Sequence, residues 1–114
     1  MDEKTTRKFL RPIRGNGELL KSGQHVAAVR YFLQGWQDFV ESETGATRPR
    51  RLSGMDGEVT LGQEDRTRIR PDQMVGQEFV LHTEKQADYE IKVYKLKENN
   101  PASGRYSIHC KLPD

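Results

Sequence analysis

The stretch Arg-Tyr-Ser-Ile-His-Cys-Lys-Leu, residues 105–112, alternates polar and apolar side chains without interruption. Successive side chains of a β-strand point to opposite faces, so this period of two offers one face to a core and the other to water. A helix would need apolar residues at positions i, i+3 and i+4, which the stretch lacks. Residues 105–112 therefore predict a half-buried strand.

The same alternation recurs at residues 79–83 and 89–94, which are separated by a loop of hairpin length. With residues 105–112 these segments predict a three-stranded antiparallel meander. Residues 52–61 carry a similar pattern, and no long helical pattern lies between the expected strands. Such spacing is typical of all-β folds. We therefore predict a single small antiparallel β-barrel or β-sandwich of about six to eight strands, with little helix.

Residues 25–34 fit two interpretations. Val29, Tyr31 and Leu33 alternate with polar or opposite-facing residues, as they would in a strand. Val26, Val29 and Leu33 also lie on one stripe of a helix. The abundance of β-branched and aromatic residues favours the strand, and the helix stays the alternative.

Short segments with glycine or proline predict the turns and loops. Asn16-Gly17 and Asp56-Gly57 are typical of tight turns, because both residues tolerate a positive φ angle. Ser22-Gly23-Gln24 predicts the turn of a hairpin that leads into the next strand. Residues 41–51 contain no large apolar side chain and predict a loop.

The chain of 114 residues predicts one domain with one modest core. Residues 1–14 are basic and poor in apolar side chains, and Pro12 interrupts a helix there. We therefore expect them to form a flexible or edge-docked N-terminal extension. Residues 15–114 are then a single all-β domain. Much of the core is expected from Phe32, Trp36, Val59, Leu61, Phe79, Leu81, Tyr89, Ile91, Val93, Tyr106, Ile108 and Cys110.

Composition bounds the class of protein. Apolar residues make up 33% of the chain and charged residues 32%, with a net charge of +2, so a thin core is combined with a charged surface. No apolar stretch approaches the roughly 18 residues of a membrane-spanning helix. The N-terminus lacks the apolar region of a secretory signal, and Cys110 is the only cysteine, so no internal disulfide forms. We expect a cytoplasmic protein without membrane contact.

The chain offers few groups for catalysis or metal binding. Its three histidines and one cysteine include no set with metal-ligand spacing. His82 and His109 fall on the polar faces of their strands, and Cys110 falls in the apolar phase, where a thiol is buried and unreactive. No nucleophile elbow, phosphate-binding glycine loop or zinc-protease motif is present. We therefore expect no enzyme activity, no metal and no cofactor.

Two groups of arginines form the best candidate ligand site. Residues 62–76 are expected to be a loop with one helical turn starting at Pro71 or Asp72, and three arginines alternate within them. In an extended chain these three would point one way and offer planar forks to phosphate or carboxylate. Solvated surface charge is the alternative, since neither group has aromatic residues between its members. The groups are Arg66, Arg68 and Arg70, and Arg48, Arg50 and Arg51.

Trp36 also has two interpretations. With Tyr31 and Phe39 nearby in the sequence, it is either a core aromatic or a platform on which a ligand stacks. A core position is the more common one for a tryptophan in a chain with few apolar residues, and we expect it here.

For function we carry two hypotheses. The first is a small non-catalytic binding or interaction module that meets a protein partner, or a second copy of itself, through an exposed sheet edge. Strand addition needs no special residues, so it is compatible with a chain that lacks motifs. The alternative is a β-barrel that binds an anion, a nucleotide or nucleic acid through the arginine groups, with an affinity that falls steeply as salt rises.

Overall fold

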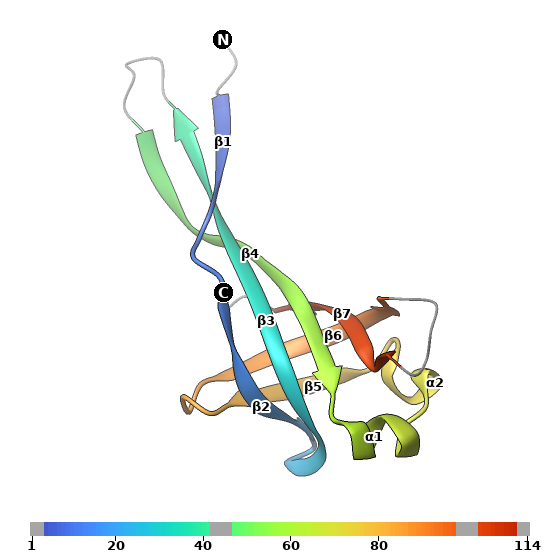
Figure 1. Ribbon diagram of the computed structural model, residues 1–114. Coiled ribbons are helices and arrows are strands. Elements are labelled where there is room, and N and C mark those ends of the chain that lie inside the picture. The colour runs from blue at the N-terminus through green and yellow to red at the C-terminus, as the bar shows by residue number, and fades with distance from the viewer. Residues whose placement is uncertain (1–3, 42–46, 98–102, 112–114) are drawn as a thin grey trace.

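The computed structural model describes residues 4–41, 47–97 and 103–111, and the side chains described lie in 7–38, 54–97 and 103–111. Seven strands and two short helices make up this part of the chain (Figure 1). In chain order they are β1 (Lys4–Phe9), β2 (Ile13–Lys21), β3 (Gln24–Glu41), β4 (Thr47–Leu61), α1 (Gln63–Arg68), α2 (Pro71–Met74), β5 (Glu78–Thr83), β6 (Asp88–Leu96) and β7 (Arg105–Cys110).

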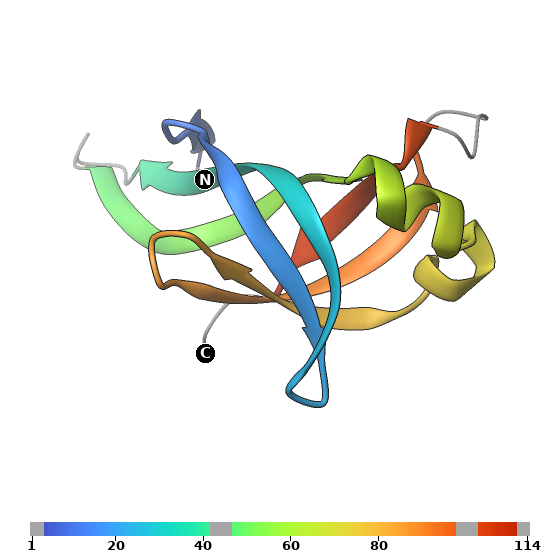
Figure 2. The same ribbon diagram turned by 60° about the horizontal axis from the view of Figure 1, so that its bottom comes forward.

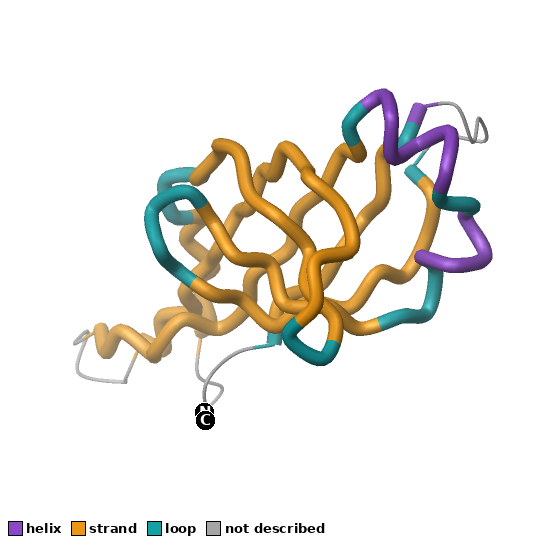
Figure 3. The backbone as a smooth tube through the Cα atoms, turned by 90° about the horizontal axis from the view of Figure 1, so that it is seen from below, coloured by secondary structure: helices purple, strands orange, loops and turns teal. Residues whose placement is uncertain are grey.

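Six of the strands pair into a closed ring. The order of neighbours is β3-β2-β5-β6-β7-β4, every pairing is antiparallel, and β4 pairs back with β3. Figure 3 shows these strands running around a common interior. The all-β prediction is therefore confirmed. Residues 25–34 lie in a strand, and the C-terminal meander is present as β5, β6 and β7.

Strands β3 and β4 continue beyond the ring as a long hairpin (Figure 1). The pairing of β3 with β2 ends at Leu33, and from Trp36 to Glu41 the same strand pairs with β1 instead. Residues 47–54 of β4 pair with this outer part of β3. We call β1, residues 36–41 of β3 and residues 47–54 of β4 the arm. With the arm, the molecule measures 57 × 31 × 21 Å along its principal axes.

The hydrophobic core fills the interior of the ring. On β3 the odd-numbered residues from Ala27 to Leu33 are buried, so the even-numbered residues lie on the outer face. The same alternation holds on β5 and through Ile91 and Val93 of β6, whereas in β7 Ser107 is buried between Tyr106 and Ile108. The buried apolar residues are Leu19, Ala27, Val29, Tyr31, Leu33, Val59, Leu61, Ile69, Met74, Phe79, Leu81, Ile91, Val93, Tyr106 and Ile108.

Most of the predicted core is confirmed, with two corrections. Eight of the predicted residues are buried, and Tyr89 and Cys110 are half-buried against the core. Phe32 and Trp36 are outside it, since both are only half-buried and occupy even-numbered positions of β3. Their place on the outer face follows from the phase of the strand, in which Tyr31 and its odd-numbered neighbours point inward.

Two predicted turns are wrong, and one is confirmed. Asn16-Gly17 lies within β2 and Asp56-Gly57 lies within β4. Both glycines allow strands to approach closely: a Cβ at position 17 would lie 2.7 Å from the carbonyl oxygen of His82, and one at position 57 would overlap the carbonyl oxygen of Phe32. The hairpin turn between β2 and β3 is at Ser22-Gly23, where φ is +53° and +78°.

Of the predicted loop at residues 41–51, Glu41 and residues 47–51 lie in strands, and residues 42–46 lie outside the described residues. β3 runs to Glu41 and β4 begins at Thr47, so the two strands pair through much of this segment. Pro49 is compatible with this pairing because, within the part of the chain that the structure describes, residues 47–54 of β4 have one strand neighbour, and an edge strand tolerates a missing N–H group.

Helices α1 and α2 connect β4 to β5 and cover one end of the ring (Figure 2). The side chains of Ile69 and Met74, from this connection, are buried and belong to the hydrophobic core. Helix α1 corrects the prediction of a loop; a helix of six residues is unstable alone, and contacts with the ring hold it in place. Helix α2 begins at Pro71, as predicted. Among the described residues, no helix is long and apolar enough to cross a membrane.

Candidate functional site

The arginines at positions 66, 68 and 70 do not form one row. Arg66 and Arg68 lie in helix α1, where residues two apart point to different sides, and Arg70 precedes helix α2. The expectation of an extended segment with three aligned guanidinium groups is therefore wrong. Whether these arginines bind an anion stays a prediction.

Contacts of these arginines are within the protein. Nη2 of Arg66 donates to the carbonyl oxygen of Leu61 at 3.1 Å. Arg68 donates to the carbonyl oxygen of Val26 at 2.9 Å and to Asp65 at 2.6 Å. Nε of Arg70 lies 3.3 Å from the carboxylate of its neighbour Asp72. The bonds of Arg66 and Arg68 fasten α1 to the end of β4 and to β3, which is a structural role, and the ion pair of Arg70 is local to the start of α2.

Asp65 completes the attachment of helix α1. Its carboxylate accepts the bond from Arg68 and a second bond from the backbone N–H of Ala28, at 3.0 Å. The hydrogen bond from Arg68 is the main cause that holds the pKa of Asp65 below its ordinary value. The charged carboxylate thus joins the helix to an outer position of β3.

The second predicted group lies in the arm. Arg48, Arg50 and Arg51 are in β4, and Arg48 is opposite Val40 of β3 in the strand pairing. The side chains of these arginines fall outside the described residues. Whether they bind an anion stays a prediction.

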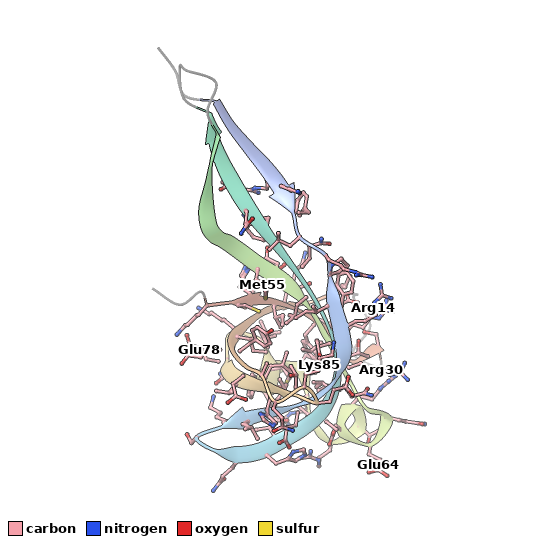
Figure 4. The ribbon with its side chains drawn as sticks, turned by 90° about the vertical axis from the view of Figure 1, so that its left-hand side faces the viewer. Arg14, Arg30, Met55, Glu64, Glu78 and Lys85 are labelled. Atoms are coloured by element: carbon pink, nitrogen blue, oxygen red, sulfur yellow. The ribbon has the colours of Figure 1, made fainter. Side chains whose placement is uncertain are left out.

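A different set of arginines gathers on the outer face of the ring. The strand register places Arg30 of β3 beside Thr60 of β4, and Thr60 beside Arg105 of β7. Arg14 of β2 is opposite Phe32 of β3, one step further along the same face. Figure 4 shows Arg14 and Arg30 projecting from the same side of the molecule, away from the ring. Three exposed arginines from three strands therefore share one face.

These arginines surround a hollow of about 490 Å³. Its lining also includes Phe32 and one acidic residue, Glu58. The carboxylate of Glu58 is paired with Nζ of Lys97, so its negative charge is compensated. The lining of the hollow is therefore cationic. Its lining residues are Arg14, Gly15, Asn16, Arg30, Tyr31, Phe32, Glu58, Thr60 and Arg105.

On this side of β3, the guanidinium groups of two arginines lie over aromatic rings. The guanidinium carbon of Arg14 lies 5.6 Å from the ring centroid of Phe32, and that of Arg7 lies 5.0 Å from the ring centroid of Trp36. Nε of Arg7 also bonds to Asp38 at 3.2 Å. Cation–π contacts of this kind contribute about 0.5–1 kcal/mol at exposed sites, and they restrict the side chain to one place.

The indole ring of Trp36 lies against the neighbouring strand of the arm, β4. It lies over Gly54, the residue opposite in β4, where a Cβ would overlap the indole ring. Phe9 of β1 is opposite Trp36 on its other side. Directly opposite residues of an antiparallel pair share a face, so Phe9, Trp36 and Arg7 lie on one side of the arm.

We call the arginines at positions 7, 14, 30 and 105, with the aromatic rings of Phe9, Phe32 and Trp36, the basic face. It runs from the hollow on the ring to the foot of the arm, along the even-numbered side of β3. The same side carries two acidic residues, Asp38, which is bonded to Arg7, and Glu58, which is paired with Lys97. The alternation of arginine and aromatic side chains, absent from both predicted arginine groups, is present here through strand pairing.

Sequence reasoning missed the basic face because its arginines are far apart along the chain. One signal was present: the phase that places Val29 and Tyr31 inside also places Arg30 and Phe32 outside. The partners from β1, β2 and β7 follow only from the register of pairing, which local patterns do not encode.

His82 and His109 are each paired with a different carboxylate. Nδ1 of His82 lies 2.5 Å from Asp88, and this hydrogen bond is the main cause that raises the pKa of His82. His109 is paired with Asp56 and stacks on the ring of Tyr94, with 4.2 Å between centroids. Strand β6 separates β5 from β7, so the two histidines do not share a site.

Neither a metal cluster nor a reactive thiol is found in the described part of the chain. No group of three histidine, cysteine or acidic side chains there could hold a metal ion. Burial raises the pKa of Cys110 to about 12, so its thiol stays protonated at neutral pH. The basic face is therefore the candidate site that the geometry favours.

Comparison with known proteins adds no assignment to this geometry. The chain matches no protein-family model, and it has no significant match among curated proteins or solved structures.

Proposed function

We propose that this protein is a non-catalytic module that binds nucleic acid along the basic face. The observation that carries the proposal is the row of guanidinium groups on one side of β3, two of which lie over aromatic rings. This is the alternative function that the sequence suggested, with a different set of arginines as its site.

Repeated phosphate groups match a row of arginines in charge and in hydrogen bonding. Each guanidinium fork can donate two parallel bonds to a phosphate, and such charge-assisted bonds are about twice as strong as neutral ones. The rings beneath Arg7 and Arg14 restrict these side chains before a ligand arrives. Less conformational entropy is then lost on binding. The basic face is thus suited to an extended polyanion.

A protein partner bound through a sheet edge is the second candidate. Within the described residues, β1 and the outer part of β4 each pair on one side only, which leaves two edges on the arm. These edge strands contain Lys4, Lys8, Arg48 and Pro49. Charged residues and proline disfavour addition of another strand, so this composition favours nucleic acid.

A cytoplasmic location is part of the proposal. It is supported by the single cysteine, which leaves no internal disulfide to require an oxidising compartment. Nucleic acid and a reduced cysteine are both compatible with that compartment.

Salt-dependent binding to labelled oligonucleotides tests the proposal. Fluorescence anisotropy of a mixed-sequence strand of about 20 nucleotides, and of its duplex, is measured between about 50 and 200 mM salt. The variant that carries Arg14→Ala, Arg30→Ala and Arg105→Ala should bind at least about tenfold more weakly, with a salt slope reduced by about two for the single strand and by nearly three for the duplex. Each lost arginine removes one phosphate contact and its released counterion.

A charge-matched variant serves as the control. Lys92→Ala, Lys95→Ala and Lys111→Ala remove the same charge from exposed positions that do not line the hollow. This variant should bind within about twofold of the wild type, because distant charges are screened. An equal loss in both variants would leave only non-specific attraction. Absence of binding by the wild type at about 50 mM salt would end the proposal.

A further inference from the structure

Phe9 is the most exposed of the large apolar side chains that the structure describes, with 61% of its surface accessible. It lies on the same side of the arm as Arg7, two residues earlier in β1. An exposed aromatic ring beside a guanidinium group is the combination that stacks a base and bonds to its phosphate.

The backbone that carries Phe9 is well fixed. Leu10, the next residue, donates its N–H to the carbonyl oxygen of Gly35 at 2.9 Å and accepts a bond from the side chain of Gln34 at 2.8 Å. These bonds hold the end of β1 against β3 where the arm meets the ring. The ring of Phe9 thus projects from backbone that is bonded to β3 at the next residue, and no core surrounds it.

Resting on the proposed function, we infer that the ligand of the basic face is single-stranded nucleic acid and that Phe9 stacks one of its bases. In a duplex the bases are already paired and stacked, so a ring on a protein surface cannot reach their faces. An unpaired base has both faces available. The positive charge of the arginines at the hollow supports this occupant over an apolar protein surface, whereas the charge of Arg7 is compensated by Asp38.

The path of such a strand follows β3. Phe9 lies beside Trp36, and Arg30 at the hollow is six residues further back along β3, a distance of about 20 Å at roughly 3.3 Å per residue. A single-stranded nucleic acid that stacks one base on Phe9 therefore places the phosphates of nucleotides a few positions away at the hollow. The two ends of the basic face would then contact one ligand.

Three probes of one sequence separate stacking from charge: a single strand, its duplex, and an abasic strand that keeps the phosphates and sugars but lacks bases. Wild-type protein should bind the single strand at least about fivefold more tightly than either other probe. Phe9→Leu, which keeps an apolar side chain without a ring, should remove most of this difference. Phe9→Tyr keeps the ring and should retain it. Because Phe9 is exposed, none of these changes removes a core contact.

The outcomes distinguish this inference from the proposed function. If wild type binds the duplex or the abasic strand as tightly as the single strand, or if Phe9→Leu weakens all three probes alike, base stacking on Phe9 is refuted. The proposed function survives that result, provided that loss of Arg14, Arg30 and Arg105 still weakens binding. If no probe binds at low salt, the proposed function fails, and this inference fails with it.

Discussion

The ring and the arm are built from the same antiparallel pairing, and β3 runs through both, yet they differ in what lies beneath the strands. The ring encloses fifteen buried apolar residues, and none of these is among the arm side chains that the structure describes, at residues 7–9, 36–38 and 54. In its described part the arm adds no residue to the core, and there it depends on hydrogen bonds and cross-strand side-chain contacts, which are individually weak. Burial therefore stabilises the ring, and exposed side chains such as Arg7 and Phe9 of the arm are available for contact.

The shape of the molecule reflects this division. The radius of gyration is 16.7 Å, against about 13 Å for a compact chain of similar length. The basic face begins on the ring and ends at the foot of the arm, so it spans the boundary between the two regions. We expect substitutions in the ring interior to change stability and those on the basic face to change binding.

The largest expected effect is on stability in the ring. Leu81 is fully buried, and Leu81→Ala should lower the free energy of unfolding by about 2–5 kcal/mol, from lost transfer energy and a cavity. Phe9→Ala, in the arm, should change it by less than about 0.5 kcal/mol. Urea unfolding followed by far-UV circular dichroism measures both. Similar losses in the two variants would abolish the contrast between ring and arm.

A substitution in helix α1 tests the distinction between arginines that stabilise the fold and arginines that bind the ligand. Arg68→Ala removes the bonds to Val26 and Asp65 and should cost about 1 kcal/mol of unfolding free energy. Its affinity for a single strand should stay within about twofold of the wild type. Arg70→Ala is the control, since its one exposed ion pair contributes little. A tenfold loss of affinity in Arg68→Ala would move the binding site to the helices.

Unfolding of the arm can be followed separately from that of the ring. Trp36 is the only tryptophan and lies in the arm, so its fluorescence reports on that region alone. In a urea titration the fluorescence change should precede the far-UV circular dichroism change, because a region with few buried contacts opens at lower free energy. Coincident transitions would indicate one cooperative unit.

The smallest effect is a pH dependence on the outer surface of the ring. The hydrogen bond to Asp88 raises the pKa of His82 above its ordinary value of 6.5, so the folded state favours the protonated imidazole. Its contribution to stability is present in full below pH 6.5 and is lost as the pH rises through the raised pKa. A proton NMR titration should show the pKa of His82 falling in Asp88→Asn. An unchanged value would mean that the pair is absent in solution.

Local patterns in the sequence determined the strands and most of the core. Alternation at residues 79–83 and 105–110 was sufficient to predict strands and the apolar residues that they bury, because a period of two is a property of each strand alone. Ser107 is the exception, since it lies in the polar phase and is buried, and residue 112 lies outside the described part of the chain. Ser22-Gly23 likewise determined a turn, since both residues take a positive φ angle there. These predictions needed no knowledge of the neighbouring strands.

Only the tertiary structure decided the arm and the basic face. Gly17 and Gly57 resemble turn residues in the sequence, yet they allow close approach between paired strands. Closure of the ring places β2, β3, β4 and β7 side by side, and one hollow is therefore lined by Arg14, Arg30 and Arg105. Register and closure depend on burying one face of every strand at once, and that condition extends over the whole chain. A local pattern therefore predicts which residues face outward, while the fold decides which of them become neighbours.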